Sequence, residues 1–253
     1  MSEQVLVEEA NGVLEVTINR PDQRNAMTKE AAEAIAAAMD RLDAEASLRC
    51  AILTGAGGTF CAGMDLKGFL KGEFPVAGER GFGGLTAWTP KKPVIAAVDG
   101  FALAGGCELA LACDMIVANR DAKFGIPEAK RGLVAAGGGV VQLPRLLPRP
   151  LAMELALTGD PIGAERAFEL GLVNRLADGP AIEGARELAA TIAENGPLAL
   201  IASKGIIRDS WLWPDEKVNE LQTPYIAHVF TSEDAKEGAR AFAEKRKPDW
   251  QGK

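Results

Sequence analysis

The chain has 253 residues, of which 47% are hydrophobic and 25% charged, and its formal net charge is −7. These values are ordinary for a soluble globular protein and argue against a mainly disordered chain. The acidic balance argues against nucleic-acid binding, because contacts to phosphates need a basic surface. No apolar run reaches the ~18 residues of a membrane span, and the first residues lack the basic and apolar regions of a secretory signal.

Scarce residue types narrow the possible chemistry. The only histidine, His228, excludes metal sites built from several histidines, and no serine lies in the G-x-S-x-G setting of a hydrolase. We therefore expect no metal, proton transfer through carboxylates, and a surface or interface position for His228. The four cysteines lie in apolar surroundings without a C-x-x-C pair, which predicts reduced, buried thiols in a cytoplasmic protein: Cys50, Cys61, Cys107 and Cys113.

Short β-rich runs occur along the first 180 residues. Residues 14–20 alternate between apolar and polar, which predicts a half-exposed strand. Residues 50–55, 93–100 and 115–119 are continuously apolar, as in strands that are buried on both faces. Residues 171–176 predict one more strand.

Helical patterns fall between these strands. Residues 29–45 place Ile35, Met39 and Leu42 at helical spacing, after Thr28 as a plausible N-cap. Strands that alternate with helices predict an α/β fold.

The strand pattern disappears after about residue 180. Residues 181–196 predict a helix that ends at an Asn-Gly pair, and residues 232–248 predict another that is capped near Ser232. We therefore expect two regions, an α/β core over residues 1–195 and a helical region over residues 196–253.

Glycine-rich stretches do not match nucleotide-binding motifs. Phe60 stands where the third glycine of G-x-G-x-x-G would be, and Phe69 stands where a P-loop has its lysine. Residues 71–86 are also glycine-rich but have no helical or strand period. We expect them to form a mobile loop of the kind that often carries function.

Glu108 lies in a stretch, residues 102–114, that is otherwise almost entirely small or apolar. A carboxylate in such surroundings costs free energy unless a partner compensates it. If a helix begins near Gly105, its first amides lack partners within the helix and suit an anion. Glu108 would then lie in the first turn, beside a potential oxyanion hole. A first-turn glutamate that only stabilises the helix is about equally compatible with the pattern.

A second carboxylate and a second amide donor are also candidates. Glu128 follows Pro127 in a pattern that predicts a turn entering a helix, so it too can be a simple first-turn acid. Two carboxylates at one reacting centre could act as acid and base, although the sequence spacing does not establish that they meet. The backbone amide of Met64 could be exposed before a helix start at Asp65, and an Asp N-cap after a glycine turn is the alternative there.

Six stretches together resemble the crotonase superfamily, the enoyl-CoA hydratase/isomerase family, over essentially the full length. In order they are NRPDQRNAM, LTGAGGTFCAGMDL, KKPVIAAVDGFALAGGCELALACD, AKFGIPEAKRGL, LALTGDPIGAERAFELGLVNRL and DAKEGARAFAEKRKPDW. The resemblance implies a spiral of β-β-α repeats, followed by a helical trimerisation region. It also implies a trimer or a dimer of trimers, and an acyl-CoA thioester substrate that carries coenzyme A itself, with no separate cofactor.

The resemblance assigns a role to each site residue. Met64 and Gly105 would supply the two N–H groups that hold the thioester oxygen, and Glu108 and Glu128 match the catalytic glutamates of family hydratases. Further substrate contacts are implied at Arg24, Ala26, Ala62, Asp65, Leu66 and Lys67. The cationic Arg24 and Lys67, with residues 244–247, could meet the coenzyme A phosphates, although a solvated basic helix end explains residues 244–247 equally well.

These matches predict an enoyl-CoA hydratase that reversibly adds water to the 2,3 double bond of a trans-2-enoyl-CoA in fatty-acid β-oxidation. Glu108 would orient the water and accept its proton, and Glu128 would deliver a proton to the α carbon. Two departures concern the pocket. Met64 stands where hydratases often have alanine, and residues 133–139 replace a Pro-Gly-Ala-Gly-Gly type of run.

Other functions stay open at this point. Carnitinyl-CoA dehydration and double-bond isomerisation are the nearest alternatives within the family. A non-catalytic acyl-CoA-binding scaffold is the alternative of another class, and the presence of both glutamates argues against it. RNA binding finds no support in the acidic charge or in an aromatic content of 6%.

Overall fold

The computed structural model describes residues 3–253, and a six-stranded sheet lies at its centre. The strand order is β1-β2-β3-β4-β6-β9, in which β1 and β2 are antiparallel and every later pair of neighbours is parallel. These strands are β1 (Val5–Ala10), β2 (Val13–Ile18), β3 (Cys50–Gly55), β4 (Val94–Val98), β6 (Met115–Asn119) and β9 (Arg175–Ala177). Parallel neighbours require crossover connections, which helices supply here.

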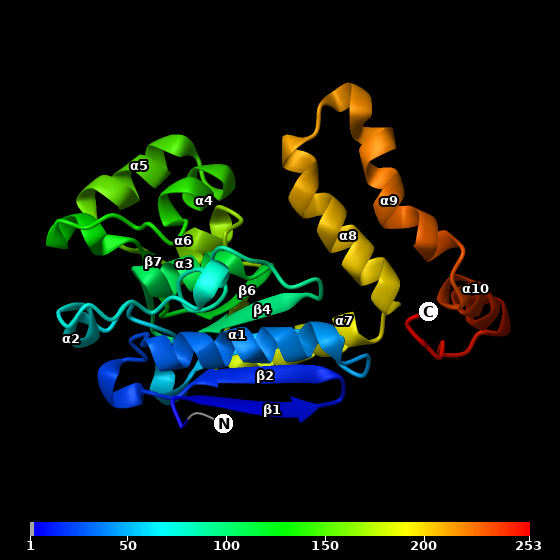
Figure 1. The fold of residues 1–253 in the computed structure, drawn as a ribbon, viewed down its shortest axis with the longest axis horizontal. Helices are drawn as coiled ribbons and strands as arrows, with labels where there is room; N and C mark the ends of the chain where they lie inside the picture. The colour runs from blue at the N-terminus through cyan, green and yellow to red at the C-terminus, as the bar shows by residue number, and fades with distance from the viewer. Residues whose placement is uncertain (1–2) are drawn as a thin grey trace.

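The central strands β3, β4 and β6 are largely buried, as their continuous apolar runs predict. Helix α7 (Ala181–Ala193) covers one face of the sheet, where its alanines pack against Ile52, Ile95 and Val117. Helices α1 (Lys29–Ala44) and α3 (Gly105–Ala112) contribute to the core on the other face. Figure 1 shows α1 lying along the sheet.

The sequence signals for α1 are confirmed in detail. The Thr28 hydroxyl caps the helix by accepting a hydrogen bond from the Ala31 amide at 3.1 Å. Ile35, Met39 and Leu42 are all buried on its inner face. The predicted apolar spacing therefore does describe the side of α1 that faces the core.

The strand predicted over residues 171–176 is wrong in its first part, since the strand is β9 and begins at Arg175. Gly171 has a φ of +81°, and the amides of Leu172 and Val173 donate to the carbonyl of Ala167. These bonds close the C-terminus of α6 (Ala164–Glu169) in the left-handed turn that glycine favours. The apolar residues after Gly171 are therefore buried in a helix end.

A second sheet has three strands in the order β5-β7-β8. They are β5 (Phe101–Leu103), β7 (Lys123–Gly125) and β8 (Ile162–Gly163). The chain runs from the large sheet to the small sheet and then into a helical segment, first as β4-β5-α3. It repeats this as β6-β7, followed by the 3₁₀ helix η4 (Pro127–Arg131) and by α4 (Gly139–Leu146). This repetition is the predicted spiral of β-β-α units.

The other helical segments connect these units. Helix α5 (Arg149–Thr158) contacts both α4 and η4. The short segments are α2 (Leu66–Phe69), η1 (Pro21–Gln23), η2 (Ala56–Gly58), η3 (Gly78–Arg80), η5 (Ser210–Leu212) and η6 (Asp215–Lys217).

The chain beyond β9 is helical, as the loss of strand pattern predicts. It contains α7 on the sheet, then α8 (Pro197–Asp209), α9 (Val218–Phe230) and α10 (Glu233–Glu244). Figure 1 shows α8 and α9 as a long hairpin that stands apart from α4 and α5. The Lys204 ammonium ties α8 to the core through an ion pair of 2.6 Å with Asp114. Ser232 caps α10 as predicted, since its hydroxyl accepts from the Ala235 amide at 3.0 Å.

Three other predictions can be compared with the structure. All four cysteines are free thiols, and Cys50, Cys61 and Cys107 are buried while Cys113 is partly buried. His228 lies on α9 and is exposed, as expected for a surface residue. Over residues 3–253, no helix combines the length and the apolar character that a membrane crossing needs.

Candidate active site

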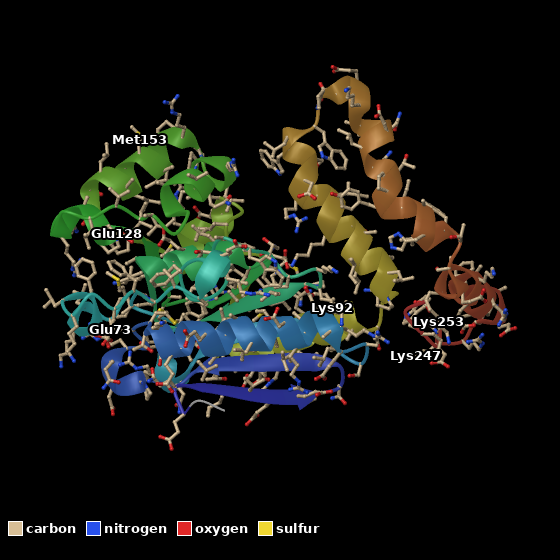
Figure 2. All side chains as sticks on the ribbon, viewed as in Figure 1. Glu73, Lys92, Glu128, Met153, Lys247 and Lys253 are labelled. Carbon is tan, nitrogen blue, oxygen red and sulfur yellow. The ribbon has the colours of Figure 1, made fainter. Side chains whose placement is uncertain are left out.

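A cavity of about 730 Å³ lies between α3, η4 and the irregular segment over residues 62–87. Its lining is mainly apolar and includes the rings of Phe69, Phe74 and Phe82. The charged residues of the lining are Arg24, Glu108, Glu128 and Arg131. In Figure 2, Glu128 lies on the side of the molecule away from α8–α10. The structure thus brings both predicted glutamates to a single cavity.

Helix α3 begins at Gly105, as predicted, so the Gly105 amide has no partner within the helix. The preceding residue, Ala104, has φ +53° and ψ −130°, a conformation that residues other than glycine rarely adopt. Its backbone is held there by a hydrogen bond from its amide to the Gly125 carbonyl and by bonds that its own carbonyl accepts from Cys107 and Glu108. This sharp turn sets the direction of the first amides of α3.

The amide of Met64 is directed by a bridge between Met64 and Met27. Met27 donates to the Gly63 carbonyl at 2.7 Å and accepts from the Asp65 amide at 3.0 Å. In such a parallel bridge the N–H of Met64 itself points away from Met27. Met64 lines the cavity, so the geometry leaves its N–H available there.

Close packing at Gly63 places the segment of Met64 beside the start of α3. A Cβ built on Gly63 would lie 2.8 Å from the Ala104 Cβ and 3.4 Å from the Gly105 amide nitrogen. Gly63 also has a φ of +105°, so both its conformation and its close approach favour glycine. The two candidate oxyanion donors are therefore carried by segments in direct contact.

Glu108 is 4% exposed and is held by an amide from another part of the chain. Its Oε1 accepts a hydrogen bond of 2.8 Å from the backbone N–H of Gly139, the first residue of α4. Burial raises the pKa of Glu108, while hydrogen bonds from the amides of Gly139 and Gly137 oppose that rise. The N-terminus of α4 thus supplies the compensation that a buried carboxylate requires.

Glu128 lies on η4, directly after Pro127 at the start of that 3₁₀ helix. Its Oε2 is buried without a hydrogen-bond partner among the described residues. Burial raises the pKa of Glu128 to about 7, and the negative charge of Glu108 adds to this effect. A hydrogen bond from its own backbone amide and the charge of Arg131 oppose the rise. A carboxyl group with such a pKa can donate a proton at neutral pH.

The predicted substrate-contact residues divide into two groups. Arg24, Ala62 and Leu66 line the cavity, whereas Ala26, Asp65 and Lys67 do not belong to its lining. Asp65 instead caps α2, because its carboxylate accepts from the amides of Lys67 at 2.9 Å and Gly68 at 3.3 Å.

Asp65 also forms an ion pair of 2.9 Å with Arg20, whose guanidinium donates to the Ala26 carbonyl as well. Burial opposes the ionisation of Asp65, but the Arg20 guanidinium and the capped amides hold its pKa below the ordinary value. Asp65 and Ala26 therefore stabilise the wall that carries Met64 and Arg24.

The basic residues at the end of α10 pair with neighbouring carboxylates. Arg246 lies 2.6 Å from Glu237, and Lys247 lies 2.8 Å from Glu194. Neither basic residue lines the cavity. These contacts agree with a solvated basic helix end.

Several residues of the site were not identified from sequence. Gly139 ends the run 133–139 that departs from the family pattern, but its contact with the distant Glu108 had no sequence signal. Phe82 packs directly against Gly105, since a Cβ built there would lie 2.2 Å from the Phe82 Cζ. Phe82 comes from the aperiodic stretch 71–86, which was expected to carry function. Arg131 belongs to the family-like stretch around Glu128 but received no role.

The β-β-α spiral and the cavity that it encloses define a protein of the crotonase fold. A crystal structure of enoyl-CoA hydratase from Mycobacterium tuberculosis H37Rv is similar, with a TM-score of 0.97 and 56% identity, and each chain covers 100% of the other. A crystal structure of carnitinyl-CoA hydratase from Mycobacterium avium has a TM-score of 0.79 and 40% identity, again with 100% coverage of both chains.

The chain belongs to the enoyl-CoA hydratase/isomerase family, because the sequence model of that family matches residues 8–253. The enoyl-CoA hydratase EchA19 of Mycobacterium tuberculosis is 45% identical over 98% of this chain and 96% of its own length. The carnitinyl-CoA dehydratase of Salmonella typhi is 43% identical over 100% of both chains. The family resemblance of the six sequence stretches is therefore confirmed.

Proposed function

We propose that this protein is an enoyl-CoA hydratase, which adds water reversibly to the 2,3 double bond of a trans-2-enoyl-CoA thioester. One observation carries the proposal: Glu108 and Glu128 line the same cavity and influence each other electrostatically, next to the free start of α3. The names of the relatives above support a hydratase or a closely related lyase.

The reaction begins with the thioester oxygen bound by the amides of Met64 and Gly105. These donors stabilise the negative charge that moves onto this oxygen when the β carbon is attacked. Glu108, as a carboxylate held by Gly139, orients a water molecule and accepts its proton as the new C–O bond forms. Glu128 in its protonated form then delivers a proton to the α carbon. The reaction needs no redox cofactor or metal, because it only moves protons and one C–O bond.

The residues around Met64 contribute to substrate binding in different ways. The Arg24 side chain lines the cavity beside Ala62, and we assign it to the phosphates of coenzyme A. Lys67 is exposed just outside the lining and can add a second positive charge at the same end. Leu66 contacts the apolar part of the substrate, whereas Asp65 and Ala26 contribute by fixing the backbone.

The proposal extends to the assembly, the location and the pathway of the protein. We propose that the protein forms a trimer or a dimer of trimers and is cytoplasmic. We also propose that it acts in fatty-acid β-oxidation or a related degradation pathway. Exposed large apolar side chains on the outer helices support self-association, because such residues are normally buried in an interface. They include Val141, Met153, Leu157, Trp211 and Phe230.

Carnitinyl-CoA dehydration is the second candidate, because several relatives of 42–43% identity carry that name. The two activities share the same carboxylates and oxyanion donors and differ only in the acyl group. A non-catalytic scaffold that binds acyl-CoA would not need Glu128 to keep a buried oxygen without a partner.

The direct test is to add the purified protein to crotonyl-CoA and to record the absorbance of the conjugated thioester. We expect the absorbance to fall as the double bond is hydrated, and to rise again when 3-hydroxybutyryl-CoA is the starting material. Enoyl-CoAs of increasing length and carnitinyl-CoA complete the panel. Turnover of carnitinyl-CoA alone would replace the first candidate by the second. Tight binding without turnover of any member would indicate a scaffold.

A further inference from the structure

Arg131 is a cation of the cavity wall that the proposed reaction does not use. It lines the cavity together with Glu128, and no hydrogen bond or ion pair joins its side chain to another residue in the described part of the chain. Its neighbour Lys130, in contrast, is not part of the cavity lining and pairs with Asp160. The two adjacent cations of η4 thus differ, because only one of them is available to a bound molecule.

The geometry of η4 directs Arg131 to the same side as Glu128. In a 3₁₀ helix the side chains at positions i and i+3 are eclipsed, and about 6 Å along the axis separates them. Arg131 is close enough to lower the pKa of Glu128 but makes no ion pair with it, and Glu128 Oε2 keeps no partner. The guanidinium therefore lies one turn beyond the carboxyl group that acts on the α carbon.

Arg131 and Arg24 come from different segments of the cavity lining. Arg24 belongs to the wall of Met64, since its carbonyl accepts a hydrogen bond from the Ala62 amide at 3.0 Å. Arg131 belongs to the wall of Glu128. If Arg24 meets coenzyme A, the substrate passes from Arg24 through the oxyanion donors to the two glutamates, and the acyl group continues towards Arg131.

The rest of that wall is apolar. Leu133 and Val134 follow Arg131 in the lining. The segment of Met64 adds the rings of Phe69 and Phe74, which pack edge to face at 5.6 Å. Arg131 is itself exposed, so it lies where this apolar lining opens to solvent. A carboxylate that reaches this opening can pair with the guanidinium, whereas an alkyl chain gains nothing from it. An arginine without a partner offers two parallel N–H groups of the geometry that a carboxylate binds.

We propose that Arg131 binds a carboxylate at the far end of the acyl group, so that the preferred substrates are enoyl-CoA thioesters of dicarboxylic acids. This inference rests on the proposed hydratase function and names its substrate class. It also separates this protein from enzymes that act on a quaternary ammonium acyl group, because a guanidinium repels a second cation at the same place.

The test compares trans-glutaconyl-CoA, which ends in a carboxylate, with crotonyl-CoA, which ends in a methyl group. For the wild type we expect kcat/KM to be at least about tenfold higher with glutaconyl-CoA, the typical effect of a hydrogen-bonded charge pair. In R131Q this ratio falls to about one, and R131K retains part of it. The ratio of the two kcat/KM values is informative because Glu108 and Glu128 act on both substrates. If R131Q also alters the pKa of Glu128, both values change by the same factor and the ratio does not.

K130Q is the matched control, because it removes the same charge from the adjacent position outside the cavity lining. We expect K130Q to keep the wild-type ratio. A wild-type ratio near one, or an unchanged ratio in R131Q, would overturn the inference. Equal losses with both substrates in R131Q would overturn it as well, since Arg131 would then hold the coenzyme A part that the two share.

Binding of the saturated analogues separates this inference from the proposed function. If the protein hydrates neither substrate, the hydratase proposal fails, but calorimetric titration with glutaryl-CoA and butyryl-CoA still tests Arg131. Binding of glutaryl-CoA that is tighter by about tenfold, and that loses this advantage in R131Q only, supports the carboxylate site. Equal affinities for both analogues contradict it.

Discussion

The two walls of the cavity hold their carboxylates in different ways. On one wall, Glu108 belongs to a regular α-helix, is almost fully buried and accepts a hydrogen bond from Gly139 at the start of α4. On the other wall, Glu128 belongs to a 3₁₀ turn, is only partly buried and has an oxygen without a partner. Amide hydrogen bonds favour the charged form of a carboxyl group, whereas burial favours its neutral form.

This difference suggests which of the two glutamates acts as the base and which acts as the acid. Burial raises the pKa of both groups, but at Glu108 the amides of Gly139 and Gly137 oppose the rise, which suits the role of base. Glu128, whose pKa is raised to about 7, suits the role of acid. The same reasoning applies whenever two like groups in one site have environments that separate their pKa values. Substitution of either glutamate, displacement of the start of α3 and a pH profile test this assignment of base and acid.

The largest effect is expected when either carboxyl group is replaced by an amide. We expect E108Q and E128Q each to lower kcat for crotonyl-CoA by about 10³-fold, because each removes one proton transfer and keeps the volume of the side chain. KM should change little, since we propose that backbone amides hold the thioester. Near-normal turnover of either variant would remove that glutamate from the mechanism.

A smaller effect is expected when the oxyanion wall is displaced. A Cβ on Gly105 would lie 2.2 Å from the Phe82 ring, so G105A must move the ring or the start of α3. We expect kcat to fall by about 10²-fold, as for the loss of one oxyanion donor. Steady-state kinetics of G105A, and of G105A combined with F82A, measure this.

The double variant should recover part of the lost turnover because the smaller side chain removes the clash. G163A is the control, since no atom lies within 4 Å of a Cβ built there. Wild-type kcat in G105A would show that the start of α3 does not hold the thioester oxygen.

The smallest effect is the pH dependence of hydration. Glu128 must be protonated to act as the acid, and its pKa is raised to about 7. We therefore expect kcat/KM for hydration to fall about tenfold per pH unit above that value. The residual activity of E128Q should not show this fall of kcat/KM at high pH. A profile that is flat from pH 6 to pH 9 would contradict the role of Glu128 as the acid.

The sequence predicted the elements whose signals are local. The strand over residues 50–55 was found at its observed bounds because a continuous apolar run between polar ends describes a strand buried on both faces. Thr28 was found as a cap because its hydroxyl bonds to an amide within the same turn. The strand near residue 175 was misplaced, because the left-handed turn at Gly171 buries apolar residues in a helix end.

The site was predicted in part. The sequence named Met64, Gly105, Glu108 and Glu128, and the structure places all four in the lining of one cavity; their proposed roles stay predictions. The contact of Gly139 with Glu108 joins two turns of the spiral, and that of Phe82 with Gly105 joins a loop to a helix. Sequence periodicity does not reveal such contacts, so the burial and the hydrogen-bond partner of Glu108 became apparent only from the fold.

The most direct test of the central idea is kcat of the double variant E108Q/E128Q beside its two single variants, measured with crotonyl-CoA. If both carboxyl groups act on one reacting centre, the double variant should be about as slow as the slower single variant, because either loss already disables the unit. Losses that multiply, to about 10⁶-fold, would show two independent contributions and contradict the shared centre.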